Sequence, residues 1–395
     1  MTYDFDKIVN RRGTSCVKWD EMPTDDVLPL WVADMDFEAA PPIKEALRQR
    51  VEHGVFGYSI VPEAYYDACI SWFKQRHDWE IRREWIQYTT GVVPAISCIL
   101  KAITMPGQKV LLTTPVYNCF FTCVRNNGCV VEESPLVVGE DGKYSIDWDD
   151  FERRCQDEKV VAYVMCNPQN PGGRVWTREE LEKVATICER HGVTVISDEI
   201  HNEIVMPGYE YVPFATVSRW AQQHCVVCTS ASKSFNIAGL QIANIICADP
   251  VLSMRIDRAI NINEVCDTNP FGFVATIAAY NECGDWMDQL CQYIQKNHQL
   301  LQDRILAEGG GMMRCMPLEG TYLAWVDCTP LCRKLGVNSD QLQAMLVEKA
   351  RVFFSSGTLY GADGEGYLRI NLACPTPLLN EALNRLFGYL KIMIN

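Results

Sequence analysis

The sequence contains no long apolar run. None of its hydrophobic stretches approaches the length of about 18 residues that a helix needs to cross a bilayer. The start, MTYDFDKIVNRRG, has no apolar segment of the kind found in a signal peptide, so we expect a cytoplasmic protein. Internal repeats and low-complexity tracts are absent too, which excludes solenoid and disordered chains. The 395 residues, 48% hydrophobic and 22% charged, are typical of a globular protein with two or three domains.

Basic residues are scarce. Lys and Arg number 36 against 50 Asp and Glu, which gives a net charge of −14. A surface of that sign repels phosphate backbones and anionic lipid headgroups. We therefore expect neither nucleic acid nor a membrane as a partner.

Histidine is also scarce, with six residues that are dispersed along the chain. Cysteine is plentiful, but its 19 residues lack the dense spacing of a disulfide framework, so we expect reduced thiols, mostly used as small buried apolar residues. The one close pair, Cys225 and Cys228, lies in the apolar stretch HCVVCTSAS. Residues three apart on a strand face opposite sides of a sheet, and no second CxxC follows. We expect no metal site.

The sequence does have a regular alternation of helical and apolar strand segments. Helices are predicted over 43–54, 62–77, 93–103, 118–128 and 178–191, and strands over 85–90, 109–114, 129–136, 159–166, 193–197 and 225–230. The last of these helices begins with a capping box, Thr177 with Glu180, and ends before Gly192. Continuous apolar strands between helices predict a mostly parallel sheet that is covered on both faces.

The pattern changes near residue 285. A long helix is followed by strands over 321–328, 352–356 and 366–374, which predicts a second, smaller α/β domain. The sequence thus divides into a large domain over 46–284 and a small domain over 285–395. The irregular N-terminal segment 1–45 is expected to pack with the small domain.

Unusual segments follow the predicted strands of the large domain. They are TTGVVP, TPVYN, NPQNPGG, SDEIH and SASKSF. Because ligands of such sheets bind at the carboxyl ends of the strands, we expect these segments to meet at one site.

Three of these segments contain residues with a chemical use. Lys233, which follows an apolar strand among small hydroxyl residues, suits a desolvated amine that forms a Schiff base, although a surface lysine fits as well. Asp198 ends a strand and needs a cationic partner, either a cofactor or a plain salt bridge. Gly91 at a helix start suits a phosphate, although many helices begin with glycine.

Together the segments resemble the fold-type-I enzymes that use pyridoxal 5′-phosphate (PLP), the class I/II aminotransferase superfamily. Within it they are most similar to the MalY/PatB-type C–S lyases, the cystathionine β-lyase and cystalysin group. The resemblance extends over nearly the whole chain through LPLWVADMDFEAAPPI, GYSIVPEAYYDA, TPVYN, NPQNPGGRVWTREEL, SDEIHNEI, SKSFNIAGLQ and GTYLAW. It implies an α/β fold of the aspartate aminotransferase type, with a large domain of mostly parallel sheet between helices and a smaller α/β domain.

The resemblance also implies roles for single residues. Lys233 matches the lysine that binds PLP and moves the Cα proton, and is the expected catalytic residue. Asp198 matches the partner of the pyridine nitrogen, and Tyr117 the aromatic residue stacked on the ring. Arg369 in YLRIN matches the arginine that binds the substrate carboxylate. Asn170 matches the donor to the 3′-oxygen of the ring and also borders that carboxylate site.

The phosphate site is expected to combine hydroxyls with the start of a helix. By resemblance, the backbone of Gly91, Val92 and Val93 and the side chains of Ser230 and Ser232 bind the phosphate. Of the two serines, Ser230 is favoured because it precedes the lysine by three residues.

Tyr58 matches a tyrosine that reaches the phosphate of the neighbouring subunit, so a homodimer with shared active sites is expected. Two positions differ from the aspartate-transaminase pattern. His201 stands where many transaminases have a tyrosine, and Gln241 stands where they have a cation on the phosphate. These two differences leave open which residue bonds the 3′-oxygen of the ring and which group neutralises the charge of the phosphate.

The resemblance favours a PLP-dependent β-lyase. It would cleave the Cβ–S bond of L-cystathionine, L-cysteine or a related S-substituted cysteine to a thiol or sulfide, pyruvate and ammonia. A PLP-dependent aminotransferase is the alternative, because Lys233, Asp198 and Arg369 serve both reactions. A non-catalytic PLP-binding regulator is disfavoured, since WVADMDF begins at residue 31 and leaves no room for a preceding DNA-binding domain.

Overall fold

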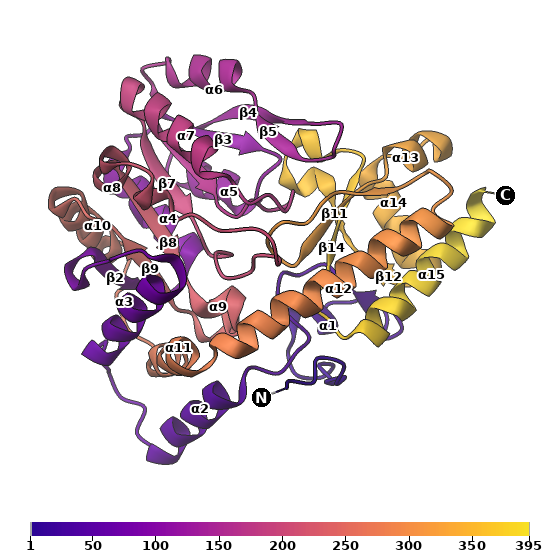
Figure 1. The fold of residues 1–395 in the computed structure, drawn as a ribbon, viewed down its shortest axis with the longest axis horizontal. Coiled ribbons are helices and arrows are strands. Elements are labelled where there is room, and N and C mark those ends of the chain that lie inside the picture. The colour runs from indigo at the N-terminus through magenta and orange to yellow at the C-terminus, as the bar shows by residue number, and fades with distance from the viewer. Residues whose placement is uncertain (1, 395) are drawn as a thin grey trace.

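The computed structural model describes residues 2–394, and its largest element is an eight-stranded sheet (Figure 1). The strand order is β2-β9-β8-β7-β6-β3-β4-β5. The strands are β2 (Ile86–Thr89), β3 (Lys109–Thr114), β4 (Val130–Val138), β5 (Tyr144–Ile146), β6 (Val160–Cys166), β7 (Thr194–Asp198), β8 (Cys225–Thr229) and β9 (Ala243–Ile246). The strands β4, β3, β6, β7 and β8, which are adjacent in this order, run parallel to one another. Strand β5 is antiparallel to β4, and β9 is antiparallel to both β8 and β2. The predicted mostly parallel sheet is confirmed. Strand β9, which is four residues long and contains the polar Asn244, was not predicted.

Helices cover both faces of this sheet, as predicted. One face packs against α4 (Val92–Ile103), α5 (Cys119–Asn126) and α10 (Pro250–Ile262). The other packs against α3 (Glu63–His77), α6 (Trp148–Cys155), α7 (Arg178–His191), α8 (Arg219–His224) and α11 (Pro270–Glu282). On β8, Cys225 lies in one of these two cores and Cys228 in the other. The two thiols therefore face opposite sides of the sheet, as their spacing predicts.

Local signals at α7 act as predicted. The Thr177 side chain accepts a hydrogen bond from the Glu180 N–H, and the Glu180 carboxylate accepts one from the Thr177 N–H. The helix ends at Gly192, whose φ of 69° is left-handed, a conformation that glycine adopts without a steric penalty.

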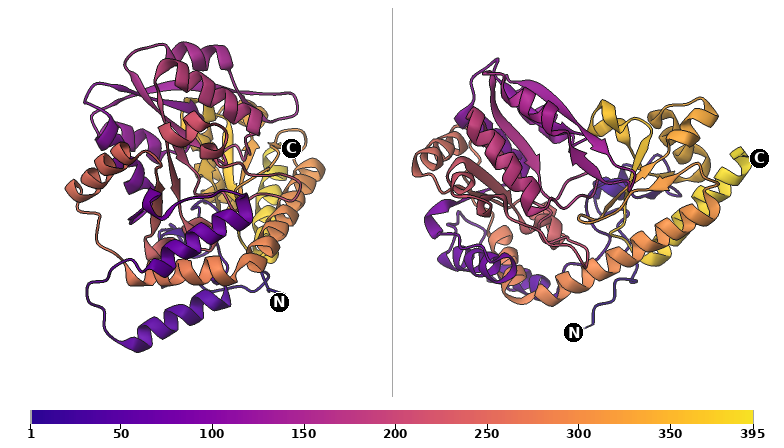
Figure 2. Two further views of the ribbon diagram at one scale, coloured as in Figure 1. Left: turned by 60° about the vertical axis from the view of Figure 1, so that its left-hand side comes forward. Right: turned by 45° about the horizontal axis from the view of Figure 1, so that its top comes forward.

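A smaller antiparallel sheet lies beside the large one (Figure 2). Its order is β10-β11-β14-β13, with β10 (Arg314–Cys315), β11 (Leu323–Asp327), β13 (Ser355–Ser356) and β14 (Tyr367–Asn371). The helices α13 (Thr329–Leu335), α14 (Ser339–Met345) and α15 (Thr376–Ile394) belong to this part. The 25-residue helix α12 (Gly284–Glu308) runs from α11 to this sheet and packs against α15 (Figures 1 and 2).

The predicted strand 352–356 is wrong as one element. It is divided into β12 (Val352–Phe353), which pairs in parallel with β1 (Leu28–Pro29), and β13, which pairs with β14. The chain changes partners at the buried Phe354, so the short segment VFFSS serves two sheets.

The N-terminal residues contain the short helix α1 (Val17–Asp20) and lead into α2 (Pro41–His53). Beyond the β1–β12 pair, the Asn371 N–H donates to the Leu30 carbonyl at 2.9 Å. These contacts bring the segment before α2 beside the smaller sheet. The division of the chain at residues 45 and 284 stays a prediction. Within residues 2–394, no helix combines the length and apolarity required to cross a membrane.

Candidate active site

The carboxyl ends of five strands lie at one edge of the large sheet. Because β9 is antiparallel to both β8 and β2, strand β2 shares the direction of β3, β6, β7 and β8. The segments that follow these strands therefore meet, as predicted. They surround a cavity of about 250 Å³. Its lining consists of Ala33, Gly91, Val92, Val93, Pro94, Tyr117, Cys166, Asn170, Asp198, Ile200, His201, Ser232, Lys233 and Ala238.

Lys233 lies on the one-turn helix α9 (Ala231–Ser234), directly after β8. Its amine donates a hydrogen bond to the Ala33 carbonyl at 2.5 Å. Burial lowers the pKa of this amine to about 8, assisted by the positive charge of Arg369 and opposed by Asp34 and Asp198. With this pKa about a tenth of the amine is neutral at pH 7, far more than for an ordinary lysine, which favours a role as nucleophile or base.

Asp198 is the last residue of β7 and is 4% exposed. Its Oδ1 accepts a hydrogen bond from the Ile200 N–H at 3.1 Å. Burial raises the pKa of this carboxyl to about 7, and the neighbouring charge of Glu199 adds to the effect. A cation placed in the cavity would reverse this shift, which makes Asp198 a suitable partner for a protonated ring nitrogen.

Arg369 reaches the site from the smaller sheet. Its Nη1 donates to Asn170 Oδ1 at 3.1 Å and its Nη2 to the Trp31 carbonyl at 2.8 Å. The Tyr360 ring lies against the guanidinium, 4.7 Å from its central carbon. Nε of Arg369 has no hydrogen-bond partner among residues 2–394. An arginine held in this way presents a fixed donor for a carboxylate.

Of the residues predicted to bind the phosphate, some line the cavity and one is engaged elsewhere. Gly91 precedes α4, whose first residues, Val92 and Val93, present the start of a twelve-residue helix to the cavity. Ser232 lines the cavity, whereas the Ser230 hydroxyl donates to the Ile242 carbonyl and accepts from the Ser232 N–H. The roles of both serines in phosphate binding stay predictions.

Tyr117 lines the cavity, and burial raises the pKa of its hydroxyl. Tyr58 does not contribute to this cavity: it is fully exposed, in the loop between α2 and α3. His201 also lines the cavity, and burial lowers its pKa to about 3, so the ring is neutral. Its Nδ1 has no hydrogen-bond partner within the described residues. Gln241 lies on the exposed side of the loop after α9.

Comparison with known proteins decides the family. The sequence model of the family "Aminotransferase class I and II" matches residues 25–386. The chain belongs to this family. It is 38% identical over 387 residues to "Cystathionine beta-lyase PatB" of Bacillus subtilis, with 97% of this chain and 98% of that protein covered. It is 35% identical to "Protein MalY" of Escherichia coli, with 98% and 99% covered. The crystal structure of cystalysin from Treponema denticola, which contains a PLP cofactor, superposes with a TM-score of 0.94 at 34% identity and covers both chains fully.

This member of the aminotransferase family also uses residues that the sequence analysis did not assign. The Tyr322 hydroxyl and the Lys233 amine donate to the same carbonyl, that of Ala33. The motif LPLWVADMDF carried the resemblance, but no role was given to its residues. At Ala33 the contribution comes from a backbone carbonyl, which every residue type offers, so no side-chain pattern could have revealed it.

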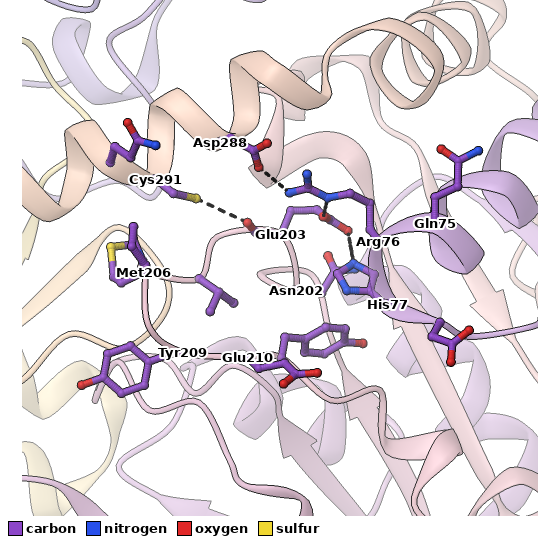
Figure 3. Close-up of a pocket in the computed structure, with 15 residues that line it drawn as sticks. Gln75, Arg76, His77, Asn202, Glu203, Met206, Tyr209, Glu210, Asp288 and Cys291 are labelled. Atoms are coloured by element: carbon purple, nitrogen blue, oxygen red, sulfur yellow. Dashed lines mark hydrogen bonds and ion pairs between the residues drawn. The ribbon is translucent and has the colours of Figure 1, made fainter.

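A second cavity of about 720 Å³ is larger than the candidate active site (Figure 3). It lies between the end of α3, the loop after β7 and α12. Two pairs of its lining side chains contact one another: His77 with Glu203 at 2.7 Å, and Arg76 with Asp288 at 2.8 Å. Lys233 does not line it. The smaller cavity therefore remains the candidate for the chemistry.

Proposed function

We propose that this protein is a PLP-dependent carbon–sulfur β-lyase of the cystathionine β-lyase type. The observation that carries the proposal is the meeting of Lys233, Asp198 and Arg369 at the edge of one cavity. The names of the similar proteins, a cystathionine β-lyase at 38% identity and cystalysin at a TM-score of 0.94, support the lyase over other reactions.

The residues of the cavity fit PLP. Asp198 suits the pyridine nitrogen, because a buried carboxyl with a pKa near 7 gains stability from a cationic partner. Tyr117 suits the ring face, and Asn170 its 3′-oxygen. The phosphate suits the start of α4 together with the Ser232 hydroxyl. When bound, PLP withdraws electrons from the Cα of an amino acid and so acidifies its Cα–H bond.

Two side chains of this protein, those of Arg369 and Lys233, then have separate roles in the elimination. Arg369, held by Asn170, binds the α-carboxylate and fixes the orientation of Cα. The Lys233 amine, neutral in part because burial lowers its pKa, removes the Cα proton as a general base. The Cβ–S bond breaks and sulfur leaves with the electron pair, taking up a proton to give the thiol. The released 2-aminoacrylate adds water and yields pyruvate and ammonia.

An aminotransferase is the second candidate, because the family takes its name from that reaction and because Lys233, Asp198 and Arg369 would serve it equally. An aminotransferase would instead use bound PLP to accept the amino group of the substrate, and a keto acid would be needed to complete the cycle. The presence or absence of that requirement separates the two candidates.

The proposal includes a homodimer with shared sites and an amino-acid substrate. The loop between α2 and α3 exposes large apolar side chains: Val55, Phe56, Tyr58 and Ile60. An exposed apolar cluster of this kind supports a contact with a second copy, in which Tyr58 would reach the partner's phosphate. A cytoplasmic location stays a prediction.

The test is pyruvate release from purified holoenzyme given L-cystathionine without any keto acid, while the cofactor spectrum is followed. Sustained release of pyruvate and thiol supports the lyase. A single half-turnover that stalls until a keto acid is added supports the aminotransferase. Lys233→Ala should abolish both turnover and the lysine-linked cofactor absorbance, and full turnover by this variant would contradict either candidate.

A further inference from the structure

The segment from Trp31 to Met35 borders the cavity without pairing as a strand. Side chains from distant parts of the chain hold each of its five carbonyls. The donors are Arg369 and Ser355 to the carbonyl of Trp31, Asn371 to those of Val32 and Asp34, Lys233 and Tyr322 to that of Ala33, and Asn236 and Arg11 to that of Met35. Two of these donors have proposed roles in the reaction: Lys233 removes the Cα proton, and Arg369 binds the substrate carboxylate. The position of this segment therefore determines where both side chains lie.

The environment of the Lys233 amine includes charges of both signs. The charged and titratable groups that act on it are Asp34 from the N-terminal segment, Asp198 at the end of β7, His201 from the loop that follows, Arg369 from β14 and Cys119 from α5. Of these, Asp34 has the largest effect among the charged groups. A change in the net charge at Asp34 and its partners should therefore change how readily the Lys233 amine is protonated.

Arg11 forms a close ion pair with Asp34 and so offsets its negative charge. Its Nη1 and Nη2 bind both oxygens of Asp34, at 3.1 and 2.5 Å, in the two-point geometry that only a guanidinium provides. Nη1 also donates to the Met35 carbonyl at 3.0 Å. Arg11 therefore binds the backbone and the carboxylate of the same short segment.

The neighbouring Asp36 has partners besides Arg11, whose Nη1 also donates to its Oδ1 at 2.8 Å. The fully buried Lys18 lies 2.6 Å from one of its oxygens, and the Trp19 indole donates to the other at 2.8 Å. Lys18 is farther from Asp34, with 3.6 Å to Oδ1. Loss of Arg11 thus leaves Asp36 paired and removes the two-point contact of Asp34.

We propose that Arg11 is a positioning residue for Lys233: it neutralises Asp34 and holds the segment that places the Ala33 carbonyl against the lysine amine. The proposal rests on the proposed role of Lys233 as the residue linked to PLP. It assigns a function to an N-terminal residue that touches neither the cavity nor Lys233.

The test is a pH titration of the cofactor absorbance in the holoenzyme, which reports protonation at the Lys233–cofactor link. Arg11→Met leaves Asp34 without its close cation, so the protonated form is favoured and the midpoint should rise by about 1 pH unit. Asp34→Asn removes the negative charge, so its midpoint should fall. Arg11→Lys keeps the charge and should return the midpoint close to that of the wild type.

Opposite shifts distinguish positioning by charge from a structural role, which would move both variants in one direction or leave both midpoints unchanged. Arg304→Met is the matched control, because Arg304 is also half-buried and ion-paired, with Glu308 on α12, and should not shift the midpoint. If Arg11→Met does not fold, Arg11→Gln replaces it, since glutamine retains a donor for Asp34 without the charge.

Unchanged midpoints in the Arg11 and Asp34 variants, or shifts in the same direction, overturn the proposal while leaving the proposed function intact. A wild-type protein with no absorbance that depends on Lys233 overturns the proposed function, and this proposal with it. The two failures are therefore distinguishable in one experiment.

Discussion

Arg369 and Asn170 meet between the two sheets, with Arg369 Nη1 3.1 Å from Asn170 Oδ1. Asn170 follows β6 of the large sheet, and Arg369 lies in β14 of the smaller one. The contact is buried, since both residues are at most 5% exposed. The residue assigned to the cofactor ring thus also orients the residue assigned to the substrate carboxylate.

Arg369→Lys should weaken substrate binding although it preserves the charge. An ammonium cannot reproduce both the contact with Asn170 and a two-point contact with a carboxylate. We expect a loss of about 2 kcal/mol, or about thirtyfold, in kcat/KM, mostly through a higher KM. Steady-state kinetics with L-cystathionine check this. Arg385→Lys on α15, where Arg385 pairs with Glu381, is the control, and an equal loss there would contradict the assignment.

The buried Asp198 should make the cofactor-free protein sensitive to pH. Its pKa of about 7 in the folded state lies above the usual value of about 3.9. Between these pH values the folded state binds a proton that the unfolded state has released, so the free energy of unfolding falls as the pH rises.

Urea unfolding of the cofactor-free protein at the two ends of this window measures that effect. Asp198→Asn has no charge to bury, so its free energy of unfolding should vary less with pH than that of the wild type. In the holoenzyme Asp198→Asn should have lower turnover than the wild type, because the variant cannot stabilise a protonated ring nitrogen. An identical pH dependence of wild type and variant would show that Asp198 is not the cause.

Much of the large sheet and most of the cavity could be predicted from the sequence. Lys233 and Asp198 each follow an apolar strand of the parallel type, and the carboxyl ends of such strands meet whatever the order of the strands. The alternation of strands and helices was therefore enough to bring these residues together. Arg369 needed the resemblance, because it comes from another sheet, and no periodicity relates the two sheets.

Two features could not be predicted, for physical reasons. The run 352–356 is uniformly apolar at its start, and only tertiary pairing divides it between β1 and β14. Ser230 and Ser232 both flank Lys233, and spacing favours Ser230 for the phosphate, yet the Ser230 hydroxyl donates to the Ile242 carbonyl and Ser232 lines the cavity. Local sequence does not determine which way a side chain turns at the start of a short helix.

Subunit mixing tests the exposed Tyr58. If Tyr58 completes the site of the partner, a mixture of inactive Tyr58→Ala and Lys233→Ala proteins forms mixed dimers in which one site has both residues intact. With equal and random exchange, half of the dimers are mixed and half of their sites are complete, so about a quarter of the wild-type activity should return. No recovery after demonstrated exchange would place Tyr58 outside the site.

The two serines should separate cofactor binding from stability. Ser232→Ala removes a hydroxyl from the cavity and should weaken PLP binding by about tenfold, with little effect on the unfolding of the cofactor-free protein. Ser230→Ala removes the cap of α9 and the contact with Ile242, so it should lower the free energy of unfolding by about 1–2 kcal/mol. PLP titration by fluorescence and urea unfolding measure the two quantities on the same pair of variants. The reverse result, with Ser230→Ala losing PLP affinity at unchanged stability, would return the phosphate contact to Ser230, the serine that its spacing to Lys233 favours.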